Sequence, residues 1–380
     1  MLINDLRIIM KYFLPVLFIL ISVSFTDLFP QKSIKFDYVG EFREGMCPVK
    51  QKDKWGFIDT EGNLVIEPVW NSFITPFFSS GVVRLQDPKT AKHGFLDKKG
   101  NTVIPFSFYS ISDFHDTVTV AYFPAYAAEK NSKAQCRAVL ILAGIELPFE
   151  LPNDYSYSTY FTEGLARARV DSKYGYMNVP GMLVIPNIYY DVKDFSNGMA
   201  SVSLARKWGV IDSTGSMVYE PQYYTPPMPF SGGYGWFNND KNRFGLIDRK
   251  GKVLIDPYYE KVFMFGDGFG TAYTRTPDND EITHIIGDSG KVAVEFRKSV
   301  MKDGFIIPES GFNDGLAAAR IGYSKYGFID TKGKIAVDFR FSMVKAFNSG
   351  RAYAEYKDPK TNKLIRGFIN TKGDFVIILE

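Results

Sequence analysis

Lys54-Trp55-Gly56-Phe57-Ile58-Asp59 decides the fold, because this stretch recurs along the chain. It returns as Lys207-Trp208-Gly209-Val210-Ile211-Asp212 and, with another aromatic residue in place of Trp, at residues 243–248 and 325–330. A sequence repeat of roughly 34–42 residues predicts a tandem array of small supersecondary units. The repeat length is counted between the glycines of consecutive Trp-Gly boxes. Two of these distances are about twice the usual length, and each predicts a degenerate unit in between. The marker glycines are Gly56, Gly94, Gly175, Gly209, Gly245, Gly327 and Gly367.

Each unit contains three sequence boxes. The first is Phe-x-x-Gly followed by small and β-branched residues, as at 195–200, and the second is the Trp-Gly box. The third runs from a Gly through apolar residues to a Pro and an aromatic pair, as at 251–259. These short runs rich in Val, Ile, Phe and Tyr are typical of β-strands. We expect the Trp-box Gly to make room for a neighbouring aromatic across the strand.

The link between the second and third boxes predicts a tight hairpin turn. It begins with Asp or Asn, whose side chain can accept a backbone N–H, and ends with Gly, which supplies a positive φ. The links are residues 59–62, 97–100, 212–215, 248–251, 330–333 and 370–373.

These boxes resemble the bacterial WG-repeat family, which is named for its Trp-Gly signature and includes the KWG repeats. Residues 54–68 are a close match, and the resemblance covers nearly the whole chain from about residue 36 onward. Tyr174, Phe244 and Tyr326 replace the Trp elsewhere, whereas His93 and Arg366 depart from the pattern. The position therefore requires a large flat side chain for packing. The resemblance implies an all-β repeat protein, often exported, with functions mostly undefined.

The predicted fold is all-β: a tandem array of antiparallel hairpins or three-stranded units, arranged as an open or curved β-solenoid. A closed β-propeller-like ring is the alternative. The single repeat domain spans residues 34–380, with about nine units and degenerate units near 115–150 and 265–300. Residues 34–39 could supply what the last segment, 375–380, lacks, as in a closed ring. An open stack with trimmed ends fits the same pattern.

Residues 1–24 predict an export signal. Arg7 and Lys11 accompany an uncharged apolar core at 12–21, and small residues follow at 22–24. The core is shorter than the about 20 residues that span a bilayer comfortably, so a cleaved signal peptide is expected, with a retained membrane anchor as the alternative. The protein is then expected in the periplasm, on the outer surface or secreted.

Bulk composition argues against several partner classes. Lys and Arg number 45 against 42 Asp and Glu, and no basic block stands out, so nucleic acid is not expected as a partner. The 380 residues include two cysteines, Cys47 and Cys136, too few for a disulfide framework. A single bridge between them stays possible in an oxidising compartment.

No residue set predicts a catalytic, metal or cofactor site, so we expect no enzyme and no cofactor. Turn capping accounts for the repeated aspartates, the glutamates stand singly, and the histidines have no partner at ligand spacing. Gly266-Asp267-Gly268-Phe269-Gly270 is a first box without the following helix that a phosphate loop needs. The residues considered are Asp59, Asp97, Asp212, Asp248, Asp330, Glu44, Glu67, Glu163, Glu220, His93, His115 and His284.

Two features remain for binding. Aromatic residues follow the third box, and alternation along a strand should bury one of each pair and expose the other. Insertions between the first and second boxes, at 86–92, 124–135, 275–281 and 357–363, map to one edge of the array. The aromatic residues are Trp70, Tyr109, Tyr189, Tyr190, Tyr223, Tyr224, Tyr258 and Tyr259.

The expected function is an exported non-catalytic scaffold that binds a protein or a cell-envelope component. The alternative is a carbohydrate-binding module that uses the exposed aromatics. A glycoside hydrolase is a remote alternative, since it requires two carboxylates about 5–10 Å apart.

Overall fold

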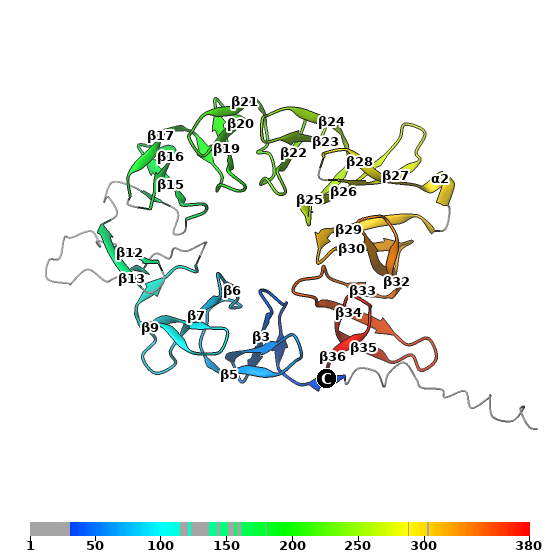
Figure 1. The fold of residues 1–380 in the computed structure, drawn as a ribbon, viewed down its shortest axis with the longest axis horizontal. Helices are drawn as coiled ribbons and strands as arrows, with labels where there is room; N and C mark the ends of the chain where they lie inside the picture. Colours follow the sequence, from blue (N-terminus) through cyan, green and yellow to red (C-terminus); the bar gives the residue numbers. More distant parts are fainter. Residues whose placement is uncertain are drawn as a thin grey trace, which may run out of the picture.

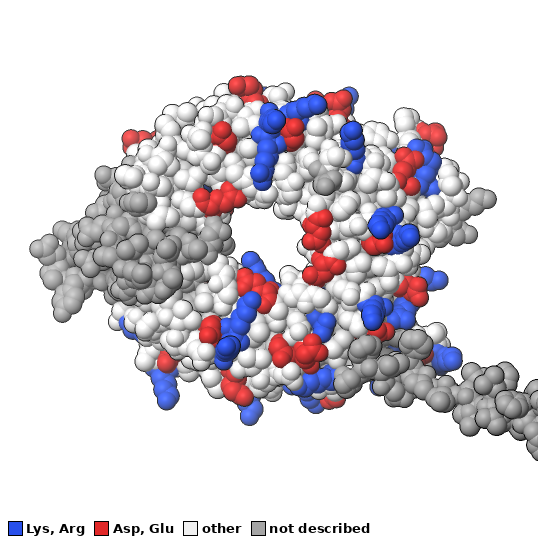
Figure 2. All heavy atoms as spheres, viewed as in Figure 1, with Lys and Arg blue, Asp and Glu red and all other residues white. Residues whose placement is uncertain are grey.

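The computed structural model describes residues 31–114, 121–122, 137–142, 145–150, 156–157, 161–179, 181–287, 289–301 and 304–380. Small antiparallel sheets follow one another around a ring (Figure 1), and the centre of the ring stays open in the space-filling view of Figure 2. The predicted all-β repeat array is confirmed. Residues 1–24, Cys136 and His115 lie outside the described residues.

A regular unit is a four-stranded sheet whose strands are in chain order. First strands such as β6 and β25 lie toward the central opening, and fourth strands such as β9 and β21 lie toward the outside (Figure 1). The first sheets hold β2 (Tyr38–Val39), β3 (Met46–Gln51), β4 (Lys54–Asp59) and β5 (Leu64–Trp70), then β6 (Phe78–Ser79), β7 (Val82–Gln86), β8 (His93–Asp97) and β9 (Thr102–Phe108). Two two-stranded sheets follow, with β10 (Ser110–Ile111), β11 (Ala121–Tyr122), β12 (Arg137–Leu142) and β13 (Ile145–Glu150).

The remaining sheets continue around the ring (Figure 1). They hold β14 (Ser156–Tyr157), β15 (Leu165–Val170), β16 (Lys173–Asn178) and β17 (Leu183–Tyr189), then β18 (Asp191–Val192), β19 (Met199–Leu204), β20 (Lys207–Asp212) and β21 (Met217–Tyr223), then β22 (Tyr234–Asn238), β23 (Phe244–Asp248) and β24 (Val253–Tyr259). Next come β25 (Lys261–Gly266), β26 (Phe269–Arg275), β27 (Glu281–Ile286) and β28 (Val292–Arg297), the short helix α2 (Lys298–Met301), and β29 (Ile306–Asn313), β30 (Leu316–Ile321), β31 (Lys325–Asp330) and β32 (Ile335–Phe341). The last sheet holds β33 (Met343–Val344), β34 (Ala352–Lys357), β35 (Leu364–Ile369), β36 (Phe375–Leu379) and β1 (Lys32–Ile34).

The Trp-Gly box forms the third strand of a sheet, and its aromatic residue packs as predicted. Trp55 and Trp208 are both buried. The role of the glycine differs from the expectation, because the fourth strand has a bulge opposite it. A Cβ on Gly56 would lie 2.7 Å from the Pro68 backbone nitrogen, and one on Gly209 would lie 2.9 Å from that of Pro221. The glycine therefore admits the backbone of the next strand more than an aromatic ring.

The aspartate turns form as predicted. The Asp59 carboxylate accepts hydrogen bonds from the backbone N–H groups of Glu61 (2.9 Å) and Asn63 (2.8 Å). Gly62 has a φ of 78°, which a glycine adopts without strain. The turns that begin at Asp97, Asp212, Asp248, Asp330 and Asn370 repeat this arrangement.

Aromatic contacts join neighbouring sheets. The residue after the Trp-box glycine packs against the phenylalanine of the next unit's first box, as Phe57 does against Phe78 with ring centroids 5.0 Å apart. Such edge-on pairs add to the burial of apolar area. The same contact joins Tyr176 to Phe195, Phe328 to Phe347 and, across the ends of the chain, Phe368 to Phe42.

Hydrogen bonds between the first-box turns join the same sheets. Glu44 has a φ of 52°, and its carboxylate accepts the backbone N–H groups of Ser80 and Gly81 in the next unit. Equivalent bonds run from Gly198 to Glu163, from Gly315 to Asp267, from Gly350 to Asp314 and from Gly45 to Ser349.

The ring is closed by the first segment of the repeat domain, so the structure shows the alternative arrangement and not the open solenoid. β1 pairs in parallel with β36, with Lys32 opposite Ile377 and Ile34 opposite Leu379. Ile34 is buried in a cluster that includes Phe42 and Phe368. Residues 32–34 thus supply a strand to the last sheet. The sequence pattern suggests residues 34–39 for this role, but β2 at residues 38–39 pairs with β3 in the first sheet.

Candidate functional site

The loops between second and third strands lie at the same end of the sheets as the links from one sheet to the next. In an antiparallel sheet with strands in chain order, these two kinds of connection must share an end. Contacts confirm it: the Lys92 ammonium lies 2.6 Å from the centroid of the Tyr109 ring, and Lys173 lies 3.1 Å from Tyr190. We call this side of the ring, with residues 86–92, 275–281 and 357–363 and the links at 109, 190 and 224, the loop face.

Two insertions on the loop face have the same structure. Asp87 accepts the N–H groups of Lys89 (2.7 Å) and Thr90 (3.0 Å), and Asp358 does the same with Lys360 and Thr361. These backbone hydrogen bonds lower the pKa of both aspartates. The Asp-Pro-Lys-Thr loops are therefore preformed. Insertion 124–135 lies outside the described residues.

The aromatic pairs alternate as predicted. Tyr189 and Tyr259 are buried, whereas their neighbours Tyr190 and Tyr258 are 56% and 41% exposed. Tyr224 is 69% exposed, and the Lys207 ammonium lies 3.2 Å from its ring centroid. Tyr109 is exposed too, and Trp70 stacks on Phe106 with centroids 4.7 Å apart. The outward tyrosines Tyr109, Tyr190 and Tyr224 are thus paired with lysines, a feature that the sequence analysis missed.

The repeated carboxylates lie on the opposite side of the ring, where they cap turns. Hydrogen bonds, led by those from the Asn101 and Thr214 side chains, lower the pKa values of Asp97 and Asp212. Glu44 and Glu163 join neighbouring units, and Glu67 and Glu220 are exposed. In the described part of the chain, no group of three His, Cys, Asp or Glu residues is placed to hold a metal ion.

The described histidines are buried. One of them belongs to a series of hydrogen-bonded side chains that the sequence analysis did not predict. His284 contacts the Tyr259 hydroxyl through Nδ1 at 2.7 Å and Glu295 through Nε2 at 2.9 Å. Burial raises the pKa of Tyr259, and the bond with His284 lowers that of Glu295. His93 occupies the aromatic position of its box, where burial lowers its pKa. Cys47 is a free buried thiol, and burial raises its pKa.

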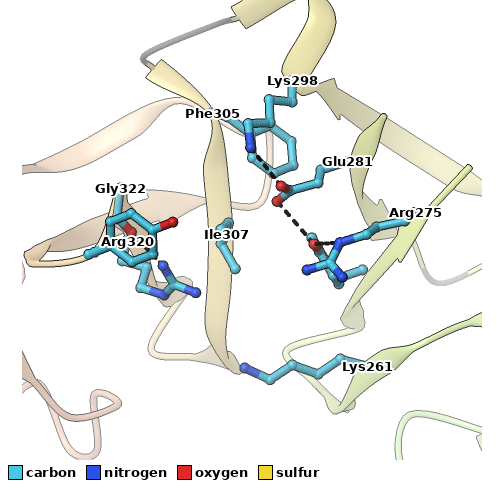
Figure 3. Close-up of a pocket in the computed structure, with 10 residues that line it drawn as sticks. Lys261, Arg275, Glu281, Lys298, Phe305, Ile307, Arg320 and Gly322 are labelled. Atoms are coloured by element: carbon cyan, nitrogen blue, oxygen red, sulfur yellow. Dashed lines mark hydrogen bonds and ion pairs between the residues drawn. The ribbon is translucent and has the colours of Figure 1, made fainter. Parts of the chain in front are cut away.

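A pocket of about 420 Å³ opens between the β25–β28 sheet and the β29–β32 sheet (Figure 3). One wall belongs to the worn unit predicted near 265–300. Apolar side chains of Phe305, Ile307 and Tyr273 form part of the lining, and Tyr323 stands 98% exposed at the rim. The remaining lining residues are Lys261, Arg275, Glu281, Lys298, Arg320 and Gly322.

Ion pairs and hydrogen bonds fix the charged groups of this pocket. Glu281 accepts Lys298 Nζ at 2.6 Å and the Tyr273 hydroxyl at 3.0 Å, as Figure 3 shows. Burial acts to raise the pKa of Glu281, but these two bonds, together with the positive charges of Lys298 and Arg275, lower it overall. Arg275 Nε donates to the Tyr273 hydroxyl at 3.1 Å. Sequence reasoning missed the pocket, since its side chains come from six elements and loops.

The fold and its surface define the class of protein: a ring-shaped β-repeat protein whose described insertions lie on the loop face. The WG-containing repeat pattern matches seven segments, at residues 33–55, 55–86, 94–116, 174–208, 208–242, 244–272 and 326–358. These segments cover more than half of the chain, which belongs to this family. No curated protein sequence matches the chain.

Several solved structures align with the chain, and one of them does so closely enough to show the same type of fold. The crystal structure of the eukaryotic initiation factor aligns with a TM-score of 0.53 at 10% identity, over 90% of this chain and 98% of that one. At that identity the likeness shows the fold alone. Apo AztD from Citrobacter koseri aligns with a TM-score of 0.38 at 11% identity, over 78% of this chain and 94% of that one. The uncharacterized protein lmo1340 from Listeria monocytogenes EGD-e aligns with a TM-score of 0.38 at 10% identity, over 89% and 97%.

Proposed function

We propose that this chain is an exported, non-catalytic ring scaffold that binds a partner protein or a cell-envelope component through its loop face. The observation that carries the proposal is the gathering of insertions and lysine-covered tyrosines at one end of the sheets. The opposite side consists of short turns whose polar groups bond within the ring. Irregular loops on a regular scaffold are a common place for binding.

Charge and apolar exposure support a binding surface of mixed character. The chain carries 45 basic and 42 acidic residues, so neither sign of charge dominates its surface. Exposed tyrosines are enriched in protein interfaces because they combine apolar area with a polar tip. Within the described residues, no helix is long and apolar enough to cross a membrane.

The test compares two variants of the full chain, each immobilised and exposed to envelope extracts. In the loop-face variant, residues 87–92 and 358–363 are shortened to the two-residue turn found at Lys52-Asp53. In the matched control, the exposed turn residues Lys99, Lys250 and Lys332 become Ser. A partner retained by the wild type and the control but lost by the loop-face variant supports the proposal. A partner lost equally by both variants contradicts it.

Export is tested separately by the mass of the mature protein. A product lacking the first 20 to 30 residues supports a cleaved signal, in the size range of such peptides. A full-length product in the membrane fraction supports the retained anchor, and a full-length product in the cytosol contradicts export.

Carbohydrate binding is a second candidate, favoured by Tyr190 and Tyr224. Both rings are exposed, and lysine covers one side of each. A sugar would have to stack on the other side. A glycan array tests carbohydrate binding. Binding that disappears in Tyr190→Ala and Tyr224→Ala supports this function, and an array that stays blank at millimolar concentration rejects it.

A further inference from the structure

The pocket lies where the repeat departs most from its own pattern. The turn after β27 repeats the backbone hydrogen bonds of the turn after β4, which aligns Gly287 with Asp59. Counting back along the strand, Thr283 takes the place of Trp55, and His284 takes that of the box glycine. Without the glycine, β27 and β28 pair without a bulge from Ile282 to Ile285. This unit has therefore lost the large aromatic side chain that most other units carry at this position of the box.

The link to the next sheet is also longer than the links at several other joints. At four joints in the described chain, one residue connects the fourth strand to the next first strand. Here residues 298–305, including α2, make the connection, and Lys298 and Phe305 from this link line the pocket. The cavity thus opens at a joint that combines a box without its aromatic residue and a link longer than one residue. The single-residue links are Tyr109, Tyr190, Glu260 and Ser342.

Cations outnumber carboxylates around the cavity. In the view of Figure 3, Lys261, Arg275, Lys298 and Arg320 surround the Ile307 side chain. Two carboxylates offset part of this charge. Glu281 pairs with Lys298, and Glu309 pairs with both Lys261 (3.3 Å) and Arg320 (2.6 Å). The group of six charged side chains thus keeps a surplus of two positive charges.

Of the four cationic side chains, Arg275 is best placed to bind a ligand. Its Nε is bonded to the Tyr273 hydroxyl, and the described residues place no carboxylate in an ion pair with its guanidinium. The terminal nitrogens of an arginine bind a carboxylate through two parallel hydrogen bonds. The same cavity offers an apolar surface on Phe305 and Ile307, with the exposed Tyr323 ring at its rim.

We propose that this pocket binds a small organic anion of the aromatic carboxylate class, with its carboxylate on Arg275 and its planar body against Ile307 and Phe305. The volume of about 420 Å³ lies in the range of small-molecule sites. The surplus of positive charge selects an anion, and the apolar lining selects an organic body over an inorganic ion. The pocket opens on the loop face, since Arg275 and Glu281 belong to residues 275–281. Its test uses a small molecule and not a partner protein, so either proposal can fail alone.

Calorimetric titration of the full chain tests the site, with benzoate as the probe. Benzamide is the neutral control of the same shape, and inorganic phosphate is the anion without an apolar body. For so small a ligand, a dissociation constant on the order of 1 mM is expected. We expect saturable binding of one benzoate per chain, and at least about tenfold weaker binding of benzamide, since hydrogen bonds to charged groups contribute that much. Phosphate should also bind more weakly than benzoate, because it has no apolar body to bury against Ile307 and Phe305.

Two pocket variants and a matched control complete the test. Arg275→Gln should weaken benzoate binding at least about tenfold. Arg206→Gln removes the same charge from an exposed turn of another sheet and should leave binding unchanged. Ile307→Trp keeps every charge but fills the cavity, and should abolish binding even if Arg275→Gln fails to fold. Absent binding, equal binding of benzamide, preferred binding of phosphate, or full binding by a folded pocket variant would each overturn the proposal.

Discussion

Single residues of the repeat have separate structural duties, and the glycine of the Trp-Gly box shows how narrow they are. Gly56 and Gly209 lie opposite a bulge, where the backbone of the next strand leaves no room for a Cβ. The sequence reveals the glycine at each copy but not its reason, because the bulge belongs to the pairing of two strands. At His284, where the glycine is missing, the bulge is missing too.

Gly209→Ala should therefore destabilise the protein by about 1–3 kcal/mol, the range for overpacked sites. Gly287→Ala is the matched control, since its Cβ would lie 3.7 Å from the nearest atom, an ordinary contact. Urea unfolding of both variants measures the difference. Equal stability of the two variants would show that the glycine has no packing role.

His93 predicts a pH dependence. Burial first, and then Arg84, lower its pKa, so the unfolded state binds a proton more readily than the folded state. The folded protein therefore loses stability as pH falls below the ordinary histidine pKa of about 6.5, because protons bind preferentially to the unfolded state. His93→Phe, which restores the aromatic of other units, should gain stability over the wild type as pH falls from about 7 to about 5. A stability difference that stays constant over this pH window would contradict the interpretation.

At the scale of elements, local features could be predicted and non-local ones could not. The aspartate turns follow from four neighbouring residues, so 59–62 and its copies were predictable. The alternation of Tyr189 and Tyr190 follows from strand geometry. The bond from Gly81 to Glu44 joins two units, and the pocket joins β25 to β30, so neither leaves a pattern in one stretch of sequence. Only the worn box at 283–287 and the long link at 298–305 pointed to an irregular joint.

The bond between first-box turns can be tested at Glu44. Glu44→Met keeps the shape of the side chain but leaves the N–H groups of Ser80 and Gly81 without their acceptor. The expected cost is about 1 kcal/mol. Glu44→Gln is the control, because its amide oxygen can still accept one bond. Hydrogen exchange at Ser80 and Gly81 should accelerate in Glu44→Met more than in Glu44→Gln, and unchanged exchange would argue against the bond.

For the whole molecule, the closed ring places all loop-face features on one side. The sequence pattern predicts an open or curved stack, with the ring as the alternative. The sequence could not decide between them, since the small rotation between units leaves no mark on a single repeat. Closure depends on contacts between the two ends of the domain. They include the β1–β36 pairing, the Phe42–Phe368 contact, and the ion pair of Lys345 with Glu41 at 2.5 Å.

A distance between spin labels at Glu41→Cys and Lys345→Cys tests closure most directly. Cys136→Ser prevents spin labelling at that native cysteine, and the native Cys47 is buried. The exposed ion pair that the labels replace is worth at most about 1 kcal/mol, so the fold should persist. The closed ring predicts one narrow distribution at the short end of the measurable range. An open stack of about nine units would separate the labels by roughly 80 Å, since packed sheets lie about 10 Å apart, and that result would contradict the ring.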